Sequence, residues 1–351
     1  MRIQTAVLAL LLPTCALAQS DVVQLTNGET IEDCRVQDFT VRELTYRKGG
    51  SVQKVSTDQV ASVELGKFAE VYRRGLADGG DPDLLLTTAR EQLKAKKPLL
   101  AQLGFAKAAE LFYLFGKGAM GSSTLEEMVK EMPDAGTVPA YYRLKFESYI
   151  GRGDDSGYRN AMIVAKKLQR DATTNAWPMG FAAEGDFFIA LIERAQGGDA
   201  KSFQDKMRQI AARVLGSNPQ LASRANVQLA HSMREGGDEE GARRIYESVL
   251  SKDSTDENSR AGAYLGLGLI AMNEGTAADR EPFRKALLYF LRVRLETADA
   301  WENLQSEALY NAMVAAQKWQ GADYRRIIGR CRLVLLNDFG HTEWANRARS
   351  M

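Results

Sequence analysis

The sequence predicts a mainly α-helical protein, a right-handed helical solenoid preceded by a small all-β barrel. Apolar and polar residues alternate at short intervals between Asp21 and Leu65, which is typical of strands. After Gly66 this alternation ends, and Ala, Leu, Glu, Lys and Arg follow at helical spacing. A Gly-Asp turn recurs in this second part about every 40 residues, a period that indicates stacked helical hairpins.

The composition argues against several classes of protein. The 351 residues include 46 Lys+Arg and 45 Asp+Glu, whereas a general nucleic-acid binder needs a basic excess. Two histidines and three cysteines leave little material for a metal site, and we expect no metal and no cofactor. The mean hydropathy of −0.31 argues against a polytopic membrane protein, and we expect no integral membrane segment in the mature chain.

The first 18 residues are predicted to be a secretory signal peptide. Arg2 precedes a short apolar run, and Ala16 and Ala18 place small side chains at the −3 and −1 positions of a cleavage site before Gln19. The run is shorter than the ~20 residues needed to span a bilayer. We therefore expect an exported protein, periplasmic or secreted.

Cleavage would leave Cys34 and Cys331 as the cysteines of the mature chain. They could pair in an oxidising compartment, but they lie near opposite ends of the chain, in different predicted domains. We therefore predict two buried free thiols. A lipoprotein signal at Cys15 is a weaker alternative, because Pro13 and Thr14 precede it where small residues are usual.

Residues 19–66 are predicted to form the β module. Asn27-Gly28 is a strong hairpin signal, and Lys48-Gly49-Gly50 supplies a second turn. The predicted strands lie near residues 21–26, 29–38, 40–47, 51–56 and 60–65. Their number and length suit an SH3-like or Sm-like barrel. The pattern resembles the small β-barrel modules that precede helical repeats in exported bacterial proteins, which implies a docking or capping role; oligomerisation through strand edges is an alternative.

Residues 67–351 are predicted to form about seven helical hairpins. Each Gly of the recurring turn can end a helix in the left-handed conformation, and each Asp can cap the next helix. The turns are Gly79-Gly80-Asp81, Gly153-Asp154, Gly197-Gly198-Asp199 and Gly236-Gly237-Asp238, with weaker forms at Asn273–Gly275 and Gly321–Asp323 and a glycine-rich break from Gly116 to Gly121.

Part of the helical region resembles tetratricopeptide repeats. Leu229-Ala230, Gly237, Ala242 and Tyr246 have the spacing of that family's small and aromatic positions, and Leu267-Gly268, Ala286 and Phe290 repeat it. The segment LVLLNDFGHTEWANRA resembles periplasmic repeat proteins of the envelope-assembly type. The resemblance extends from Trp177 to the C-terminus and implies a tetratricopeptide-like solenoid. The period departs from the ~34 residues of the standard repeat.

Catalytic motifs are not evident in the sequence. His231 and His341 lie in no recognisable nucleophile elbow, and neither a His-Glu-x-x-His motif nor a phosphate-binding loop is present. The string of Gly262, Gly266 and Gly268 falls on a predicted helix, where it favours close helix packing over nucleotide binding. We therefore predict that the protein is not an enzyme.

A binding groove is predicted on the concave surface, where this family usually binds its partners. The family's register places on it a basic and apolar set of residues: Arg224, Val227, His231, Arg234, Leu265, Leu269 and Met272. Such a set could accept a carboxylate and an apolar side chain of a peptide. The alternative is that these residues pack against neighbouring helices.

These features predict an exported scaffold that binds a protein or peptide partner in the cell envelope. An alternative is an envelope carbohydrate- or peptidoglycan-acting enzyme on a helical scaffold, which would need two carboxyl groups ~5–9 Å apart in one groove. Four tryptophans could then form a sugar platform, although core packing is the preferred interpretation: Trp177, Trp301, Trp319 and Trp344.

Overall fold

The computed structural model describes residues 20–150, 153–252, 255–298, 300–340 and 342–351. The predicted signal peptide and its cleavage site at Ala16, Ala18 and Gln19 lie outside the described residues, and so does His341.

The N-terminal part is a five-stranded antiparallel sheet with strand order β4-β3-β2-β1-β5. The turns at Asn27-Gly28 and Lys48-Gly49-Gly50 connect strands as predicted, and all three glycines have positive φ. In this order β4 and β5 are the outer strands, so closure into a barrel stays a prediction. The strands are β1 (Asp21–Leu25), β2 (Thr30–Phe39), β3 (Glu43–Lys48), β4 (Ser51–Ser56) and β5 (Val60–Glu64).

The remainder of the described chain is helical, in the tetratricopeptide-like arrangement that the sequence predicts. Each helix packs against the next, and α8, α10, α12 and α14 also pack in succession against one another. The helices are α1 (Phe68–Val71), α2 (Arg73–Leu76), α3 (Pro82–Lys94), α4 (Pro98–Leu114), α5 (Gly118–Glu131), α6 (Val138–Ile150), α7 (Asp155–Thr174), α8 (Met179–Ala195), α9 (Ala200–Val214), α10 (Pro219–Glu235), α11 (Glu239–Leu250), α12 (Glu257–Glu274), α13 (Glu281–Glu296), α14 (Glu302–Trp319), α15 (Tyr324–Asp338) and α16 (Glu343–Arg349), with 3₁₀ turns at Thr57–Gln59 and Ala77–Gly79.

The recurring Gly-Asp turns separate helices as predicted. The side chains of Asp81, Asp154, Asp199 and Asp238 each accept hydrogen bonds from backbone N–H groups in the first turn of the following helix. The weaker form at Asp323 differs, because this residue has φ 62° and its side chain makes no cap bond.

The glycine-rich break is shorter than expected. Gly116 lies in the turn with φ 71°, whereas Gly118 and Gly121 belong to α5. Gly121 lies against the ring of Tyr113 on α4, where a Cβ atom would be only 2.7 Å from two ring carbons. This close approach, and not a turn, explains the glycine.

Close helix packing also explains the glycine string of α12, as predicted. Gly262 lies against Val227, Gly266 against the ring of Tyr246, and Gly268 against the ring of Phe290. Cys34 and Cys331 are buried and free, which confirms the prediction for the thiols.

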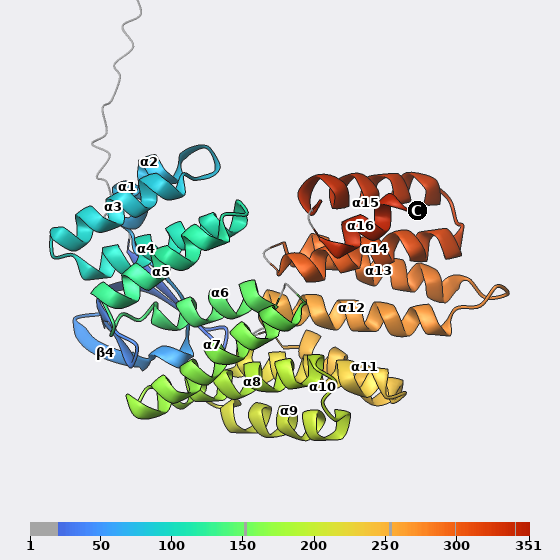
Figure 1. Ribbon diagram of the computed structural model, residues 1–351, viewed down its shortest axis with the longest axis horizontal. Coiled ribbons are helices and arrows are strands. Elements are labelled where there is room, and N and C mark those ends of the chain that lie inside the picture. Colours follow the sequence, from blue (N-terminus) through green and yellow to red (C-terminus); the bar gives the residue numbers. More distant parts are fainter. Residues whose placement is uncertain (1–19, 151–152, 253–254, 299, 341) are drawn as a thin grey trace, which may run out of the picture.

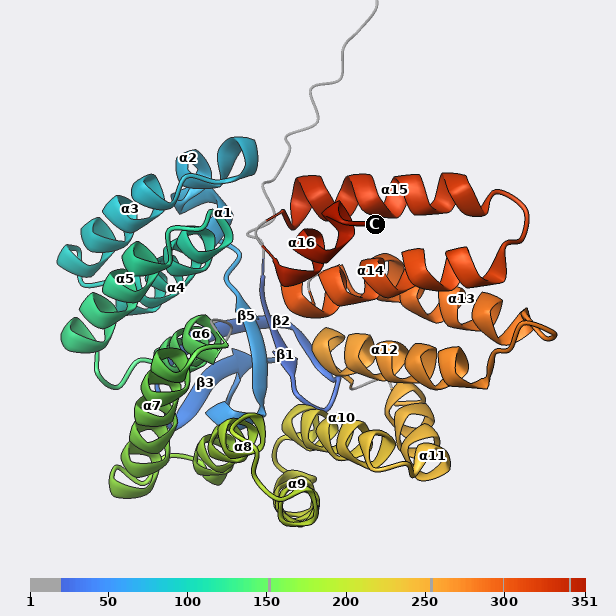
Figure 2. The ribbon, with the colours of Figure 1, turned by 45° about the vertical axis from the view of Figure 1, so that its right-hand side comes forward.

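The helices follow an open curve, with α1–α5 as one arm, α7–α10 as the base and α12–α16 as the other arm (Figures 1 and 2). The sheet is bonded to several helices of the first half. Gln102 Nε2 on α4 donates to the Phe39 carbonyl at 3.0 Å, and the Gly180 N–H on α8 donates to Asp58 Oδ2 at 2.9 Å. These contacts position the sheet against the inner helices and create the cavity described next.

Candidate partner-binding site

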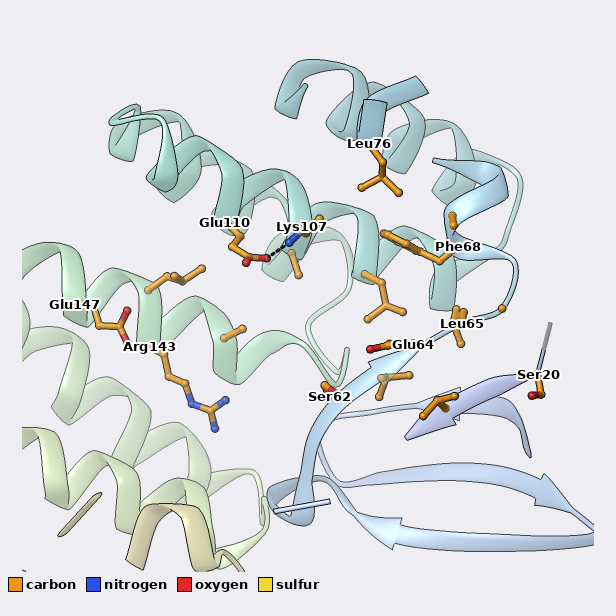
Figure 3. A pocket seen from close by; sticks show the side chains of 18 residues that line it. Ser20, Ser62, Glu64, Leu65, Phe68, Leu76, Lys107, Glu110, Arg143 and Glu147 are labelled. Carbon is orange, nitrogen blue, oxygen red and sulfur yellow. Dashed lines mark hydrogen bonds and ion pairs between the residues drawn. The ribbon is translucent and has the colours of Figure 1, made fainter. Parts of the chain in front are cut away.

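A cavity of about 790 Å³ lies between strand β5 and helices α4 and α6 (Figure 3). We call it the β5 cavity. Its walls come from β1, β5, α1, α2, α4 and α6 and are mainly apolar. The apolar lining includes Val22, Leu65, Phe68, Leu76, Leu103, Ala106, Ala140 and Leu144, and the charged lining residues are Glu64, Lys107, Glu110, Arg143 and Glu147.

Equivalent faces of two inner helices form one side of the β5 cavity. The lining residues of α4 are Leu103, Ala106, Lys107 and Glu110, and those of α6 are Ala140, Arg143, Leu144 and Glu147. Both sets have the spacing i, i+3, i+4, i+7 of a single helix face. The second set follows the first by 37 residues, which is the local repeat period.

The 37-residue period identifies three acidic residues that the sequence motifs did not single out. Glu110, Glu147 and Glu184 follow one another at intervals of 37 residues, and they lie on the successive inner helices α4, α6 and α8. The same acid at the same repeat position was the available signal, and Glu110 and Glu147 lie outside the stretch that resembles tetratricopeptide repeats.

An acid–base network runs from the cavity along the inner helices. Arg143 donates two hydrogen bonds to the Glu184 carboxylate, Nε to Oε1 at 2.6 Å and Nη2 to Oε2 at 3.0 Å. Glu184 is only 3% exposed. On α10, Arg224 Nε lies 3.3 Å from Asp256 Oδ1 at the start of α12.

Glu147 lies within this network without a direct partner. Its half-buried carboxyl group makes neither a hydrogen bond nor an ion pair with any described residue. Burial raises the pKa of Glu147 to about 7, against the opposing effect of Arg224 and Arg143. The carboxyl group therefore exchanges its proton near neutral pH.

The seven residues predicted for the groove line other parts of the solenoid, and none lines the β5 cavity. Val227 and Leu265 are each 3% exposed and belong to hydrophobic clusters that hold helices together. Leu269 and Met272 are half-buried against the C-terminal cluster. A role in binding therefore remains open for the five residues whose side chains are partly accessible.

Two of the three polar residues in the predicted set, Arg224 and His231, have defined partners. Arg224 faces Asp256 and lies in the electrostatic field of Glu184 and Glu147, so it belongs to the network beside the cavity. His231 Nδ1 lies 2.6 Å from the hydroxyl of Tyr246, and burial lowers the pKa of His231 to about 4. This imidazole is therefore neutral at pH 7. Arg234 Nε is buried without a hydrogen-bond partner among the described residues.

A second acidic group lies on the far arm of the curve. Burial raises the pKa of Glu307 on α14 to about 7, and Arg234 and Arg347 act in the opposite direction. Glu307 and Glu147 thus have similar titration behaviour on different inner helices.

The tryptophans do not share one surface. Trp177 packs edge-on against Tyr142 and Phe181 in the first hydrophobic cluster. Trp319 and Trp344 pack against the C-terminal cluster instead. A joint sugar platform is therefore not formed by these three residues.

Neither a metal-ion site nor a membrane-spanning helix is found among the described residues. No group of three or more His, Cys, Asp or Glu side chains in the described part of the chain could hold a metal ion. None of the helices with described coordinates combines the length and apolar character needed to cross a bilayer.

The solved structures to which the chain is similar include two of low sequence identity. No protein-family model matches the chain, and no curated protein matches it. The chain is similar to PilW, a type IV pilus biogenesis factor, with 12% identity and a TM-score of 0.38 over 76% of this chain and 97% of that one. It is also similar to a TPR-repeat protein of Bacteroides fragilis, with 14% identity and a TM-score of 0.20 over 72% and 99% of the two chains. The function proposed below rests on the chain's own geometry.

Proposed function

We propose that this chain is an exported, non-enzymatic scaffold that binds a peptide or protein partner on the inner surface of its helical solenoid. The β5 cavity is the observation that carries the proposal. Its volume of about 790 Å³ falls in the range of small-ligand and peptide pockets, and its lining is apolar with a few charged groups. Stacked hairpins present such a surface already ordered, which reduces the entropy lost on binding.

The partly accessible residues of the predicted groove extend this surface in the proposal. Arg234 is half-buried and its Nε is enclosed, so pairing with a partner's carboxylate would use the Nη groups of its guanidinium. Leu269 and Met272 would supply apolar contact. Arg224 is a weaker candidate, since Asp256 already neutralises it.

Export and the β module complete the proposal. Residues 1–18 supply the export signal, and cleavage should leave Gln19 at the N-terminus. The sheet, which the sequence predicts to be an SH3-like or Sm-like barrel, serves as a docking element for the first helices. N-terminal sequencing of the protein recovered from the periplasm or medium tests the processing; an intact Met1 on the exported protein would contradict it.

The test of the scaffold function is affinity capture from an extract of the cell envelope. Wild-type protein is compared with Ala106→Trp, which fills the β5 cavity, and with Ala195→Trp at an exposed position of α8. We expect one envelope protein to be retained by the wild type and by Ala195→Trp, and lost with Ala106→Trp. Equal retention by all three proteins, or by none, would contradict the proposal.

Glu147 favours one second candidate, a carbohydrate- or peptidoglycan-acting enzyme. A carboxyl group with a pKa of about 7 in a cavity can serve as a general acid. Release of soluble fragments from purified peptidoglycan by the wild type, abolished by Glu147→Gln, would support this candidate over the scaffold.

A further inference from the structure

We propose that the β5 cavity binds an extended peptide segment, which adds as a strand to the free edge of β5 and places basic side chains at Glu64 and Glu147. This inference rests on the proposed scaffold function and specifies its ligand: a basic, apolar segment in β conformation.

The first step of the argument is the position of β5 in the sheet. β5 pairs with β1 on one side, with Glu64 opposite Val22 and Ser62 opposite Gln24, and it is the last strand in the sheet order. Its five residues span about 17 Å. Figure 3 shows β5 running along the cavity, with α4 and α6 across from it. An edge strand presents unpaired N–H and C=O groups, to which an extended peptide can hydrogen-bond.

The second step concerns the wall that an added strand would meet. Leu103 and Ala106 on α4 and Leu144 on α6 face the same cavity as the edge of β5. Side chains of a strand alternate between two faces, so every second residue of the peptide would meet these apolar side chains. Glu147 lies on the same face of α6 as Leu144, so the ligand should carry both its apolar and its basic residues at every second position, on the face turned toward the helices.

The third step is the balance of charge in the cavity. Both of its cations already have partners, because Lys107 Nζ lies 3.0 Å from Glu110 Oε2 and Arg143 is bonded to Glu184. By contrast, the carboxyl groups of Glu64 and Glu147 have neither a hydrogen bond nor an ion pair within the described residues. Above about pH 7, where Glu147 is ionised, the charge on these two unpaired groups is acidic and complements Lys or Arg, so binding is measured at pH 8. An anionic ligand would have to break an existing ion pair.

The test uses the purified full chain and a fluorescently labelled, blocked peptide that carries valine and lysine on one face, Ser-Val-Ser-Lys-Ser-Val-Ser-Lys-Ser. Fluorescence polarisation measures its binding and that of a peptide with Glu in place of both lysines. We expect the Lys peptide to bind at least about tenfold more tightly than the Glu peptide. Glu147→Gln should weaken binding of the Lys peptide roughly tenfold, and Glu64→Gln roughly two- to fivefold because this residue is exposed. The control Glu70→Gln, on the exposed side of α1, should leave binding unchanged.

Strand addition itself is tested with two N-methylated forms of the Lys peptide, methylated on alternate residues and offset by one. Every second N–H of an added strand points to the sheet edge, so one form should lose about tenfold in affinity and the other should not. This comparison needs no protein variant and is independent of the folding of any substituted chain. Equal effects of the two forms would overturn strand addition, and equal binding of the Lys and Glu peptides would overturn the charge argument.

The outcomes separate this inference from the scaffold function. If neither peptide binds while Ala106→Trp still prevents capture of an envelope protein, strand addition is wrong and the scaffold function stands. If the wild type captures no envelope protein but the Lys peptide binds with the predicted N-methyl pattern, the inference stands and the scaffold assignment is wrong.

Discussion

Replacement of Glu147 by Gln should stabilise the protein at alkaline pH and have little effect at acidic pH. The amide keeps the shape of the carboxyl group but carries no charge, so the variant removes the cost of burying a carboxylate on α6. The effect should depend on pH, because the wild-type side chain is itself neutral when protonated.

The magnitude follows from the pKa of Glu147, which burial raises from 4.5 to about 7. Each tenfold change in proton affinity corresponds to about 1.4 kcal/mol, so ionisation of the folded protein costs at most about 3 kcal/mol. Because the side chain is half-buried, we expect a measured gain of about 1–3 kcal/mol.

The direction follows from the order of the two pKa values. The folded state binds the proton of Glu147 more tightly than the unfolded state. This contribution to stability is therefore complete below about pH 4.5 and is lost as the pH rises to about 7. The difference between Glu147→Gln and wild type should accordingly grow between these two values and stay constant at higher pH.

Urea unfolding followed by far-ultraviolet circular dichroism, at pH 5 and pH 8, measures this difference. Glu70→Gln is the matched control, because its carboxyl group is exposed on α1. A Glu147→Gln protein that is less stable than wild type at pH 8 would refute the reasoning. Such a result would mean that attraction to Arg143 and Arg224 outweighs the cost of burial.

Two further predictions concern packing and the buried ion pair. Gly266→Ala should destabilise the protein by about 1–3 kcal/mol in urea unfolding, because the added methyl group meets the ring of Tyr246. The control Gly329→Ala, on α15 with open space around it, should instead stabilise the protein by about 0.5–1 kcal/mol. Equal effects of the two substitutions would contradict the packing argument. Arg143→Met should lower the free energy of unfolding by about 2–4 kcal/mol at pH 7, because it leaves the buried carboxylate of Glu184 unpaired. The double variant with Glu184→Leu should recover most of this loss. A double variant as unstable as Arg143→Met would show that the charge is not the cause.

Local chemistry explains the parts of the fold that the sequence predicts well. The turns at Asn27-Gly28 and Gly49-Gly50 need positive φ, and the caps at Asp199 and Asp238 need a short acidic side chain next to a helix start. These requirements involve neighbouring residues only. The strands, and the helix boundaries at the recurring glycine turns, can therefore be predicted to within a few residues.

The β5 cavity could not be predicted because it depends on contacts between distant residues. Gln102 meets Phe39 across 63 positions, and Gly180 meets Asp58 across 122 positions. The groove prediction had a related difficulty. The register taken from the tetratricopeptide resemblance places Val227 and Leu265 on the concave surface, but it does not tell whether solvent or another helix covers each position, and here both residues are buried.

The hydrogen bonds between the sheet and helices α4 and α8 also constrain how the chain can bend. A stack of helical hairpins can change its curvature, since each hairpin contacts mainly its neighbours. Here a sheet near the start of the chain links α4 to α8, which begin 81 residues apart, at Pro98 and Met179. The sheet therefore fixes the curvature of the first half of the helical solenoid. It also sets an order of folding, because the hydrogen bond between Gly180 and Asp58 cannot form before Gly180 has left the ribosome or the translocation channel.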